Sequence, residues 1–356
     1  MEKIKLLSLF SGIGAFEKAL SNIGVEYELV NYCEIDKYAS KAYSLIHNVS
    51  EDINLQDITQ VDEKKLPKNI DLITYGFPCQ DISLAGKQRG FEDEDGNKTR
   101  SGLFFDALRI IKESQPKIAI AENVKNLTSK KFSNQFSIVL SSLEEAGYNC
   151  YWKVLNAKDY GMPQNRERVF VVSIRKDVDD GSFAFPVKIP LIKCMGDYLD
   201  DNVPLNYLLT GKQLSKIKTS NFHQEINRIQ NREGVVATLL ARDYKDPKCV
   251  QIADLQYYKL DMMNRIYSSD GICPTLKTVT GGSTEIKVKS NEVYRKLTPK
   301  EYFRLMGFAD EDYQILVDNG FPKTQLYKMA GNSIVVPVLE HLFQQIYENK
   351  EENTHE

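Results

Sequence analysis

The sequence of 356 residues contains no apolar run near the roughly 20 residues that a membrane-spanning helix needs. An apolar stretch within residues 1–12 is too short for a secretory signal, and no small-residue cleavage site follows it. These absences exclude an integral membrane protein and a secreted one. The composition, 42% hydrophobic and 27% charged, is instead that of a globular protein with a sizeable core, expected in the cytoplasm.

Clustered metal ligands are also absent. The six cysteines are scattered without a CxxC pair, and the chain has only four histidines. Because a zinc site needs several such ligands close together, we predict no metal. Five of the six cysteines are interpreted as reduced thiols without a special role.

A strong positive charge is missing as well. The net charge of −3 argues against a uniformly basic surface. Residues 186–294, however, carry fifteen Lys and Arg against twelve Asp and Glu. A mildly basic segment on an acidic body is compatible with nucleic-acid binding but does not require it.

The first half of the chain alternates strand-like and helix-like segments. Short β-rich runs bounded by turn residues lie at 3–10, 27–35, 70–77, 117–124 and 168–174. Amphipathic stretches between them, such as 103–114 and 136–147, are predicted to be helices. This alternation predicts an α/β fold with a doubly wound, mostly parallel sheet that is covered by helices on both faces.

The alternation stops near residue 185, and helical patterns return at 298–308 and 333–350. We therefore predict one catalytic domain formed by residues 1–185 and 295–356. A smaller, irregular, β-containing domain would occupy 186–294. Within this insert the sequences at 227–239 and 264–276 share Asn-Arg-Ile, a glycine and Thr-Leu at a constant offset. This internal similarity is explained either by two similar supersecondary units or by chance.

A glycine-rich turn, Phe10–Gly14, follows the first predicted strand and precedes a helix. Glycines let the backbone approach a ligand, and free helix N–H groups favour an anionic group. Glu34 ends the second strand, where an acid can accept hydrogen bonds from ribose hydroxyls, and Asp57 could bind the amine of adenine. Each acid alone is equally well explained as a solvated surface residue, but their order at successive strand ends favours an adenosine site.

Chemically reactive side chains follow three other strands of the predicted sheet. Cys79 comes after one strand, Glu122 ends the next, and Arg166 and Arg168 lie at the start of a third. A lone cysteine is more often packed than reactive. A thiol, a carboxyl and a guanidinium at one edge nevertheless fit a nucleophile, a proton donor and an anion stabiliser.

Seven motifs in one order now define a resemblance: FSGIGAFE, CEIDKYA, GFPCQDIS, AENV, QNRER, RKLTPKEYFRLMGF and AGNSIVVPVL. They span about Leu7 to Leu339, and the chain resembles the DNA cytosine-5 methyltransferases of bacterial and phage restriction-modification systems. The resemblance implies a Rossmann-like, S-adenosylmethionine-dependent fold that methylates C5 of a flipped-out cytosine in double-stranded DNA. It implies that 186–294 is the target-recognition domain, and we expect a monomer.

The resemblance also implies residue roles. Cys79 would attack C6 of cytosine, Glu122 would bind N3 and the amine, Arg168 would hold O2, and Arg166 would support the same pocket. The implied cofactor pocket comprises Phe10, Gly12, Gly14, Glu34, Ile35, Asp57, Ile58, Pro78, Leu103, Asn332 and Ser333.

For DNA, the resemblance implies a mobile catalytic loop at 85–102. Candidate DNA contacts are Ser83, Lys87, Gln88 and Arg89 near this loop, and Arg242, Arg265 and Thr275 in the insert. For Arg242 and Arg265, a solvated surface arginine is an equally good explanation.

Three alternatives remain at this stage. A tRNA cytosine-5 methyltransferase shares the catalytic motifs, although the sizeable insert favours DNA. A catalytically silent DNA-binding homologue is disfavoured because Cys79, Glu122 and Arg168 are all present. A Rossmann oxidoreductase would explain the glycine-rich turn alone, but the chain lacks the GxGxxG spacing.

Overall fold

The computed structural model has a central six-stranded sheet that confirms the predicted doubly wound α/β class. Across the sheet the strands are β2 (Tyr27–Cys33), β1 (Ile4–Leu9), β3 (Leu72–Tyr75), β4 (Ile118–Val124), β7 (Glu167–Arg175) and β5 (Tyr148–Asn156). The first four are parallel, and β7 is antiparallel to both neighbours. The structure describes residues 3–78, 91, 101–210, 213, 219, 229–230, 232–245, 247–252, 266–268, 287–289 and 293–347.

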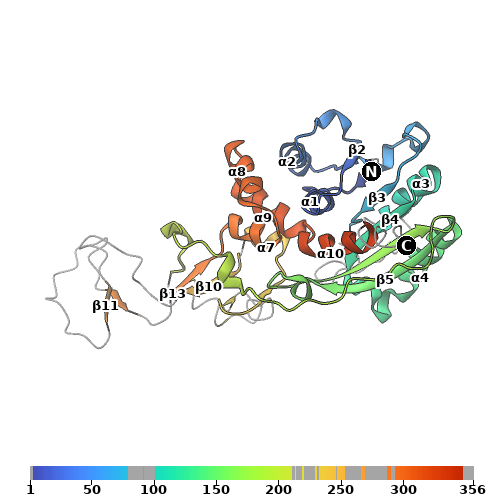
Figure 1. Cartoon of the computed structure of the whole chain (residues 1–356). Helices are drawn as coiled ribbons and strands as arrows, with labels where there is room; N and C mark the ends of the chain where they lie inside the picture. The colour runs from blue at the N-terminus through green and yellow to red at the C-terminus, as the bar shows by residue number, and fades with distance from the viewer. Residues whose placement is uncertain are drawn as a thin grey trace.

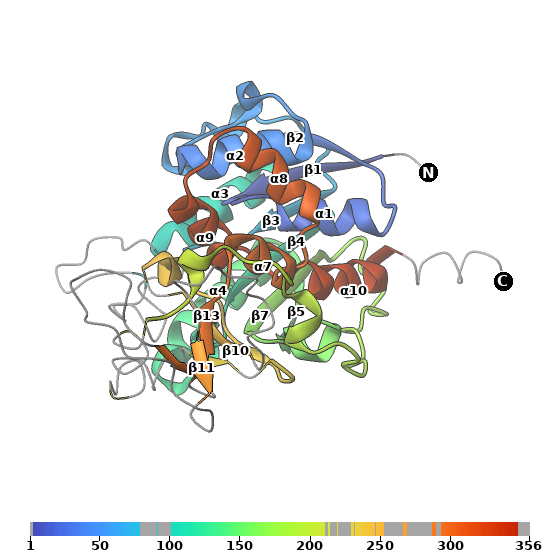
Figure 2. The same cartoon turned by 90° about the vertical axis from the view of Figure 1, so that its left-hand side faces the viewer.

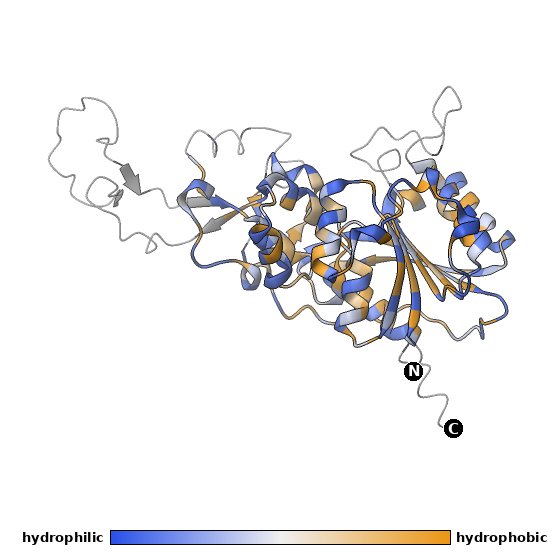
Figure 3. Ribbon diagram, turned by 90° about the horizontal axis from the view of Figure 1, so that it is seen from above, coloured by the Kyte–Doolittle hydropathy of each residue, from blue (hydrophilic) through white to orange (hydrophobic). Residues whose placement is uncertain are grey.

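Both faces of this sheet are buried, one under each of two hydrophobic clusters. Successive strand residues point to opposite faces and so join different clusters. Leu6 joins one hydrophobic cluster and Leu7 the other, and Leu72 and Ile73 divide in the same way. The helices from the first half are α1 (Ala15–Asn22), α2 (Lys37–His47), α3 (Phe104–Ser114) and α4 (Ser133–Glu145). Figure 3 shows the apolar residues concentrated in the sheet and on the helix faces that cover it.

The C-terminal segment returns to pack against the N-terminal one. It contributes α7 (Pro299–Leu305), α8 (Asp310–Asp318), α9 (Lys323–Asn332) and α10 (Val336–Tyr347). The rings of Phe343 on α10 and Phe16 on α1 meet edge to face with centroids 6.2 Å apart. Figures 1 and 2 show these red helices beside the blue N-terminal elements. Among the described residues, no helix is long and apolar enough to cross a membrane.

The insert contains short strands that form two similar parallel pairs, in line with the sequence similarity between 227–239 and 264–276. A parallel pair joins β8 (Ile229–Gln230) to β10 (Cys249–Ile252), and another joins β11 (Ile266–Ser268) to β12 (Lys287–Lys289). The corresponding strands start 37 or 38 residues apart. A third strand, β13 (Val293–Lys296), pairs with β10 and leads back to the helices that pack beside the six-stranded sheet (Figure 1). The two sequence units therefore share a strand-pairing pattern as well as residues.

Candidate active site at the carboxyl edge of the sheet

The glycine-rich turn after β1 has an unusual backbone. Phe10, Gly12 and Gly14 all adopt positive φ angles, of 54°, 57° and 78°. For Phe10 this conformation costs about 1–2 kcal/mol, which the surrounding turn must offset. A side chain added at Gly12 would meet nothing within 4 Å, so the turn leaves open space there. This is the cradle that a ligand approaching the backbone requires.

Glu34 closes one side of this turn. Its Oε2 accepts a hydrogen bond from Gly12 N at 2.9 Å, and its Oε1 accepts one from Asp36 N at 2.8 Å. Burial raises the pKa of Glu34, while these backbone donors oppose that shift. Since each carboxylate oxygen can accept a second bond, Glu34 fits the ribose role expected for it. The Ile35 side chain, 69% exposed, offers an apolar surface beside it.

The other predicted cofactor residues lie around this turn in different ways. Asp57 is partly exposed and caps a short 3-10 helix by accepting a bond from Thr59 N. The Ile58 side chain is buried in the core, so only its main chain remains for a ligand. Pro78 and Leu103 are partly exposed and Asn332 is exposed. Ser333 is buried.

The carboxylate and guanidinium predicted for chemistry meet at the ends of β4 and β7. Arg168 Nε lies 3.0 Å from Glu122 Oε1, and both side chains are less than one-fifth exposed. The antiparallel register pairs Val124 with Arg168, so Glu122 is reached along the diagonal on the same face. Burial raises the pKa of Glu122, and the positive charges of Arg168 and Arg166 oppose this.

The segment that leads from β3 toward position 79 is fastened to this pair. Asn123 Nδ2 donates to Phe77 O at 3.0 Å. Gly76 packs so closely that an added Cβ would lie 3.5 Å from Glu122 Oε2. The chain entering the Pro-Cys-Gln motif is therefore held against the predicted catalytic carboxyl. Cys79 itself lies outside the described residues.

Comparison with known proteins decides the family. The model for the C-5 cytosine-specific DNA methylase family matches residues 4–348. This chain belongs to that family. It is 32% identical to the orphan methyltransferase M.SPBetaI of Bacillus phage SPbeta, with 99% of this chain and 100% of the relative covered. It is 36% identical to the type II methyltransferase M.HhaI of Haemophilus parahaemolyticus, covering 95% and 93%.

Solved structures agree on the fold. The Entamoeba histolytica methyltransferase EhMeth superposes with a TM-score of 0.70 at 17% identity, covering 98% of this methylase and 99% of that chain. The S. pombe Dnmt2 methyltransferase gives a TM-score of 0.68 at 20% identity with the same coverage. The chain is thus a DNA (cytosine-5)-methyltransferase by family, and that family uses S-adenosylmethionine.

Arg166 of this methylase occupies an interior position between distant segments. It is 4% exposed, and its Nη1 donates to Leu239 O at 2.8 Å. Its Nη2 donates to Gly331 O at 3.1 Å and Ser333 O at 2.6 Å. These hydrogen bonds join the insert to the end of α9. Arg166 therefore acts on Glu122 by charge, while its hydrogen bonds fasten the insert to the predicted cofactor wall.

A second set of contacts reinforces this attachment. β6 (Gln164–Asn165) pairs in parallel with β9 (Val236–Ala237) of the insert. Gln164, fully buried, donates to Leu305 O at 2.8 Å, and Thr238 Oγ1 donates to Asn165 O at 2.7 Å. β7, the strand that carries Arg168, thus follows directly after β6, the segment to which the insert is attached. Sequence reasoning missed Gln164 because nothing in the motif distinguishes it from its neighbours.

Removal of the Arg166 guanidinium gives a testable stability effect. Arg166→Met is expected to lower the free energy of unfolding by about 3 kcal/mol, because three carbonyls lose a charged donor. Arg175→Met at the other end of β7 is the matched control. Arg175 is partly exposed, pairs with the exposed Asp177 and donates to only one carbonyl, Gln115 O, so its loss should cost about 1 kcal/mol. Urea unfolding measures both, and equal losses would contradict the fastening role.

Most residues predicted to contact DNA are not placed. Arg242 lies in a short 3-10 helix, Ala241–Tyr244, that packs near α9, and the Arg242 residue itself is exposed. A Cβ on Gly331 would lie 2.3 Å from Leu240 C, which shows how closely α9 approaches this segment. The remaining predicted positions lie outside the described residues: Ser83, Lys87, Gln88, Arg89, Arg265 and Thr275.

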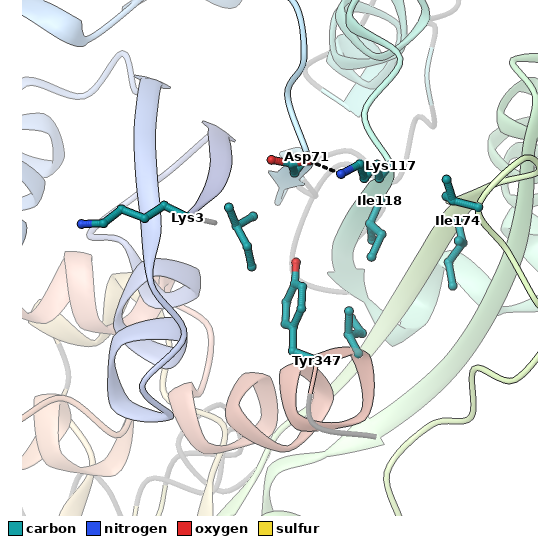
Figure 4. Close-up of a pocket in the computed structure, with 9 residues that line it drawn as sticks. Lys3, Asp71, Lys117, Ile118, Ile174 and Tyr347 are labelled. Carbon is teal, nitrogen blue, oxygen red and sulfur yellow. Dashed lines mark ion pairs between the residues drawn. The ribbon is translucent and has the colours of Figure 1, made fainter. Parts of the chain in front are cut away.

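A cavity of about 210 Å³ lies at the opposite edge of the sheet and contains none of the predicted site residues. In Figure 4 the Tyr347 ring points into it between Ile118 and Lys3, and the Lys117–Asp71 ion pair of 2.8 Å bounds it. Since the ends of β3 and β4 that carry the active-site groups are distant from this edge, the cavity has no part in the candidate site.

Proposed function

We propose that this methylase transfers a methyl group from S-adenosylmethionine to C5 of a cytosine flipped out of duplex DNA, through a covalent bond between Cys79 Sγ and C6. The observation that carries the proposal is the Glu122–Arg168 pair, to which the segment leading into Cys79 is attached. A flipped base is required because C6 is inaccessible inside a stacked duplex.

The chemistry follows from the weakness of cytosine C5 as a nucleophile. Addition of the Cys79 thiolate to C6 converts the ring to an enamine that can attack an electrophilic methyl group. The raised pKa of Glu122 favours a protonated carboxyl, which can donate to N3 and offset the charge that accumulates on the ring. Arg168 would hold O2. Loss of the C5 proton then expels the cysteine and restores the aromatic ring.

The cofactor would lie over the turn at Gly12, where a Cβ would meet no atom within 4 Å. Glu34 would bind the ribose hydroxyls, Ile35 would cover the adenine, and Asp57 would accept from its amine. Pro78, Leu103, Asn332 and the Ser333 main chain would complete the wall. When bound there, S-adenosylmethionine supplies the electrophilic methyl group.

The insert, residues 186–294, would read the DNA sequence on a catalytic domain made of 1–185 and 295–356. Its attachment beside Arg168 supports this division, because it lies next to the proposed base pocket. Relatives include both a phage orphan methyltransferase and a type II methyltransferase, and either setting fits the proposal.

Radiolabelled methyl transfer to duplex DNA and to total tRNA tests the substrate. We expect incorporation into DNA, and bisulfite sequencing of the product should locate 5-methylcytosine in one short sequence. Labelling of tRNA without labelling of DNA would overturn the proposal in favour of an RNA methyltransferase.

DNA affinity should depend strongly on salt, because phosphate contacts release counterions. For six to ten contacts, binding is expected to weaken by roughly 10³–10⁵-fold between 50 and 200 mM salt. Fluorescence anisotropy with a labelled duplex measures this slope. A flat salt dependence would contradict binding along the DNA backbone.

A further inference from the structure

A histidine lies directly beneath the turn at which the cofactor is proposed to bind. His47 is the last residue of α2, and its Nε2 lies 3.1 Å from Ile13 O. A Cβ added at Gly14 would lie only 2.0 Å from the same nitrogen. The imidazole therefore rests on the turn backbone with no room between them. Since the Ile13 carbonyl accepts, His47 must carry its proton on Nε2.

The orientation of this ring is fixed by aromatic packing. The rings of Tyr43 and His47, one helical turn apart on α2, have centroids 4.7 Å apart. Tyr43 in turn stacks on Tyr32 of β2 at 4.2 Å. Tyr43 and Tyr32 are fully buried. The ring is therefore held by an interior stack.

A buried acid on α1 faces the same region. Glu17 is fully buried, and the equally buried Tyr43 of α2 interacts with its carboxyl by charge and by a side-chain hydrogen bond. A buried carboxyl needs such a partner, because burial of an isolated charge is costly. The charge of Glu17 acts on His47, and this is a function that the proposed chemistry does not use.

The other charged groups near the ring are paired. Lys18 on α1 lies 2.7 Å from Asp312 on α8, and their effects on His47 have opposite signs. Burial lowers the pKa of His47, the Glu17 carboxylate opposes this most strongly, and the Ile13 carbonyl opposes it further. Figure 2 shows α8 passing beside α1 and α2, where this pair joins the two ends of the chain.

We propose that His47 is a positioning residue for cofactor binding and that it holds the Ile13 carbonyl through Nε2–H. The turn is then fixed at two peptide groups, one on each side of the Gly12–Ile13 peptide. Glu34 holds the N–H of Gly12, and His47 holds the carbonyl of Ile13. Without His47, the two flanking glycines leave the turn free to sample other conformations. The inference rests on the proposed cofactor site.

The test compares two substitutions by isothermal calorimetry with S-adenosylhomocysteine and no DNA. His47→Leu removes the donor and should raise the dissociation constant about five- to tenfold, the effect of one lost hydrogen bond. His47→Gln retains a terminal N–H donor and should restore most of the affinity. His341→Leu on α10, whose ring packs on Tyr160, is the matched control and should bind as the native protein does.

Steady-state kinetics should separate positioning from chemistry. We expect the KM for S-adenosylmethionine to rise in His47→Leu while kcat stays within about twofold, because the groups that act on the base are untouched. Equal affinity of the Leu and native forms would overturn the inference. If the native protein failed to bind the ligand at all, the proposed function would fail instead.

Glu17 is tested by the histidine NMR signals. The chain has four histidines, and the signal lost in His47→Gln identifies His47. Glu17→Gln should lower the pKa of His47 further, because it removes the carboxylate that opposes burial. An unchanged titration would contradict the role of Glu17. If Glu17→Gln did not fold, the two His47 variants would still decide the positioning role.

Discussion

Cys79→Ala is expected to abolish methyl transfer, lowering the rate by about 10⁴-fold or more, while cofactor binding survives. Without a thiolate at C6 the ring does not become an enamine, so C5 stays too weak a nucleophile. Transfer of a radiolabelled methyl group to duplex DNA measures the loss. Calorimetry with S-adenosylhomocysteine checks that the fold and the proposed cofactor site remain.

Other cysteines provide the control. Burial raises the pKa of Cys33 to about 12 and also raises the pKa of Cys150, so neither supplies much thiolate near neutral pH. Cys150→Ala should therefore retain activity. DNA that carries 5-fluorocytosine should trap a covalent adduct with the native protein and with Cys150→Ala, but not with Cys79→Ala. An adduct or full activity in Cys79→Ala would falsify the mechanism.

The sequence predicted β1, β2, β3, β4 and β7 and missed β5, one of the two edge strands of the sheet. β1, β3, β4 and β7 are continuous apolar runs because helices cover both sides of the sheet. β5 lies at the edge and leaves Trp152 46% exposed, so its mixed composition gave no comparable signal. α2 was also not singled out, although Asp36 is a readable N-cap that accepts from Tyr38 N and Ala39 N.

The site was predictable only where neighbouring strand ends determine it. Glu122 lies near the end of β4 and Arg168 at the start of the adjacent antiparallel strand β7, so their meeting follows from the topology alone. Arg166 differs because it lies in the break between β6 and β7, where the two-residue alternation of a strand no longer applies. Its partners are 73 to 167 positions away in the sequence. His47 contacts Ile13 across 34 positions, and no local pattern reports such a contact.

Glu122→Gln is expected to lower kcat by about 10²–10⁴-fold, the range for loss of a positioned proton donor. An amide can still donate one hydrogen bond to N3, but it has no acidic proton to transfer to the base. Glu167→Gln is the matched control on β7, since Glu167 is exposed at its carboxylate and pairs with Lys125. It should change kcat by less than about twofold.

The pH profile supplies the sharper test of Glu122. Burial raises the pKa of Glu122 above its ordinary value, so the native carboxyl retains its proton to a higher pH than an exposed glutamate. Raising the pH through that pKa removes the donor to N3, and kcat should fall on the alkaline side. Because glutamine does not titrate, this descending limb should be absent in Glu122→Gln, leaving only the rise that accompanies ionisation of Cys79. A descending limb of equal position and steepness in both proteins would show that another group donates the proton.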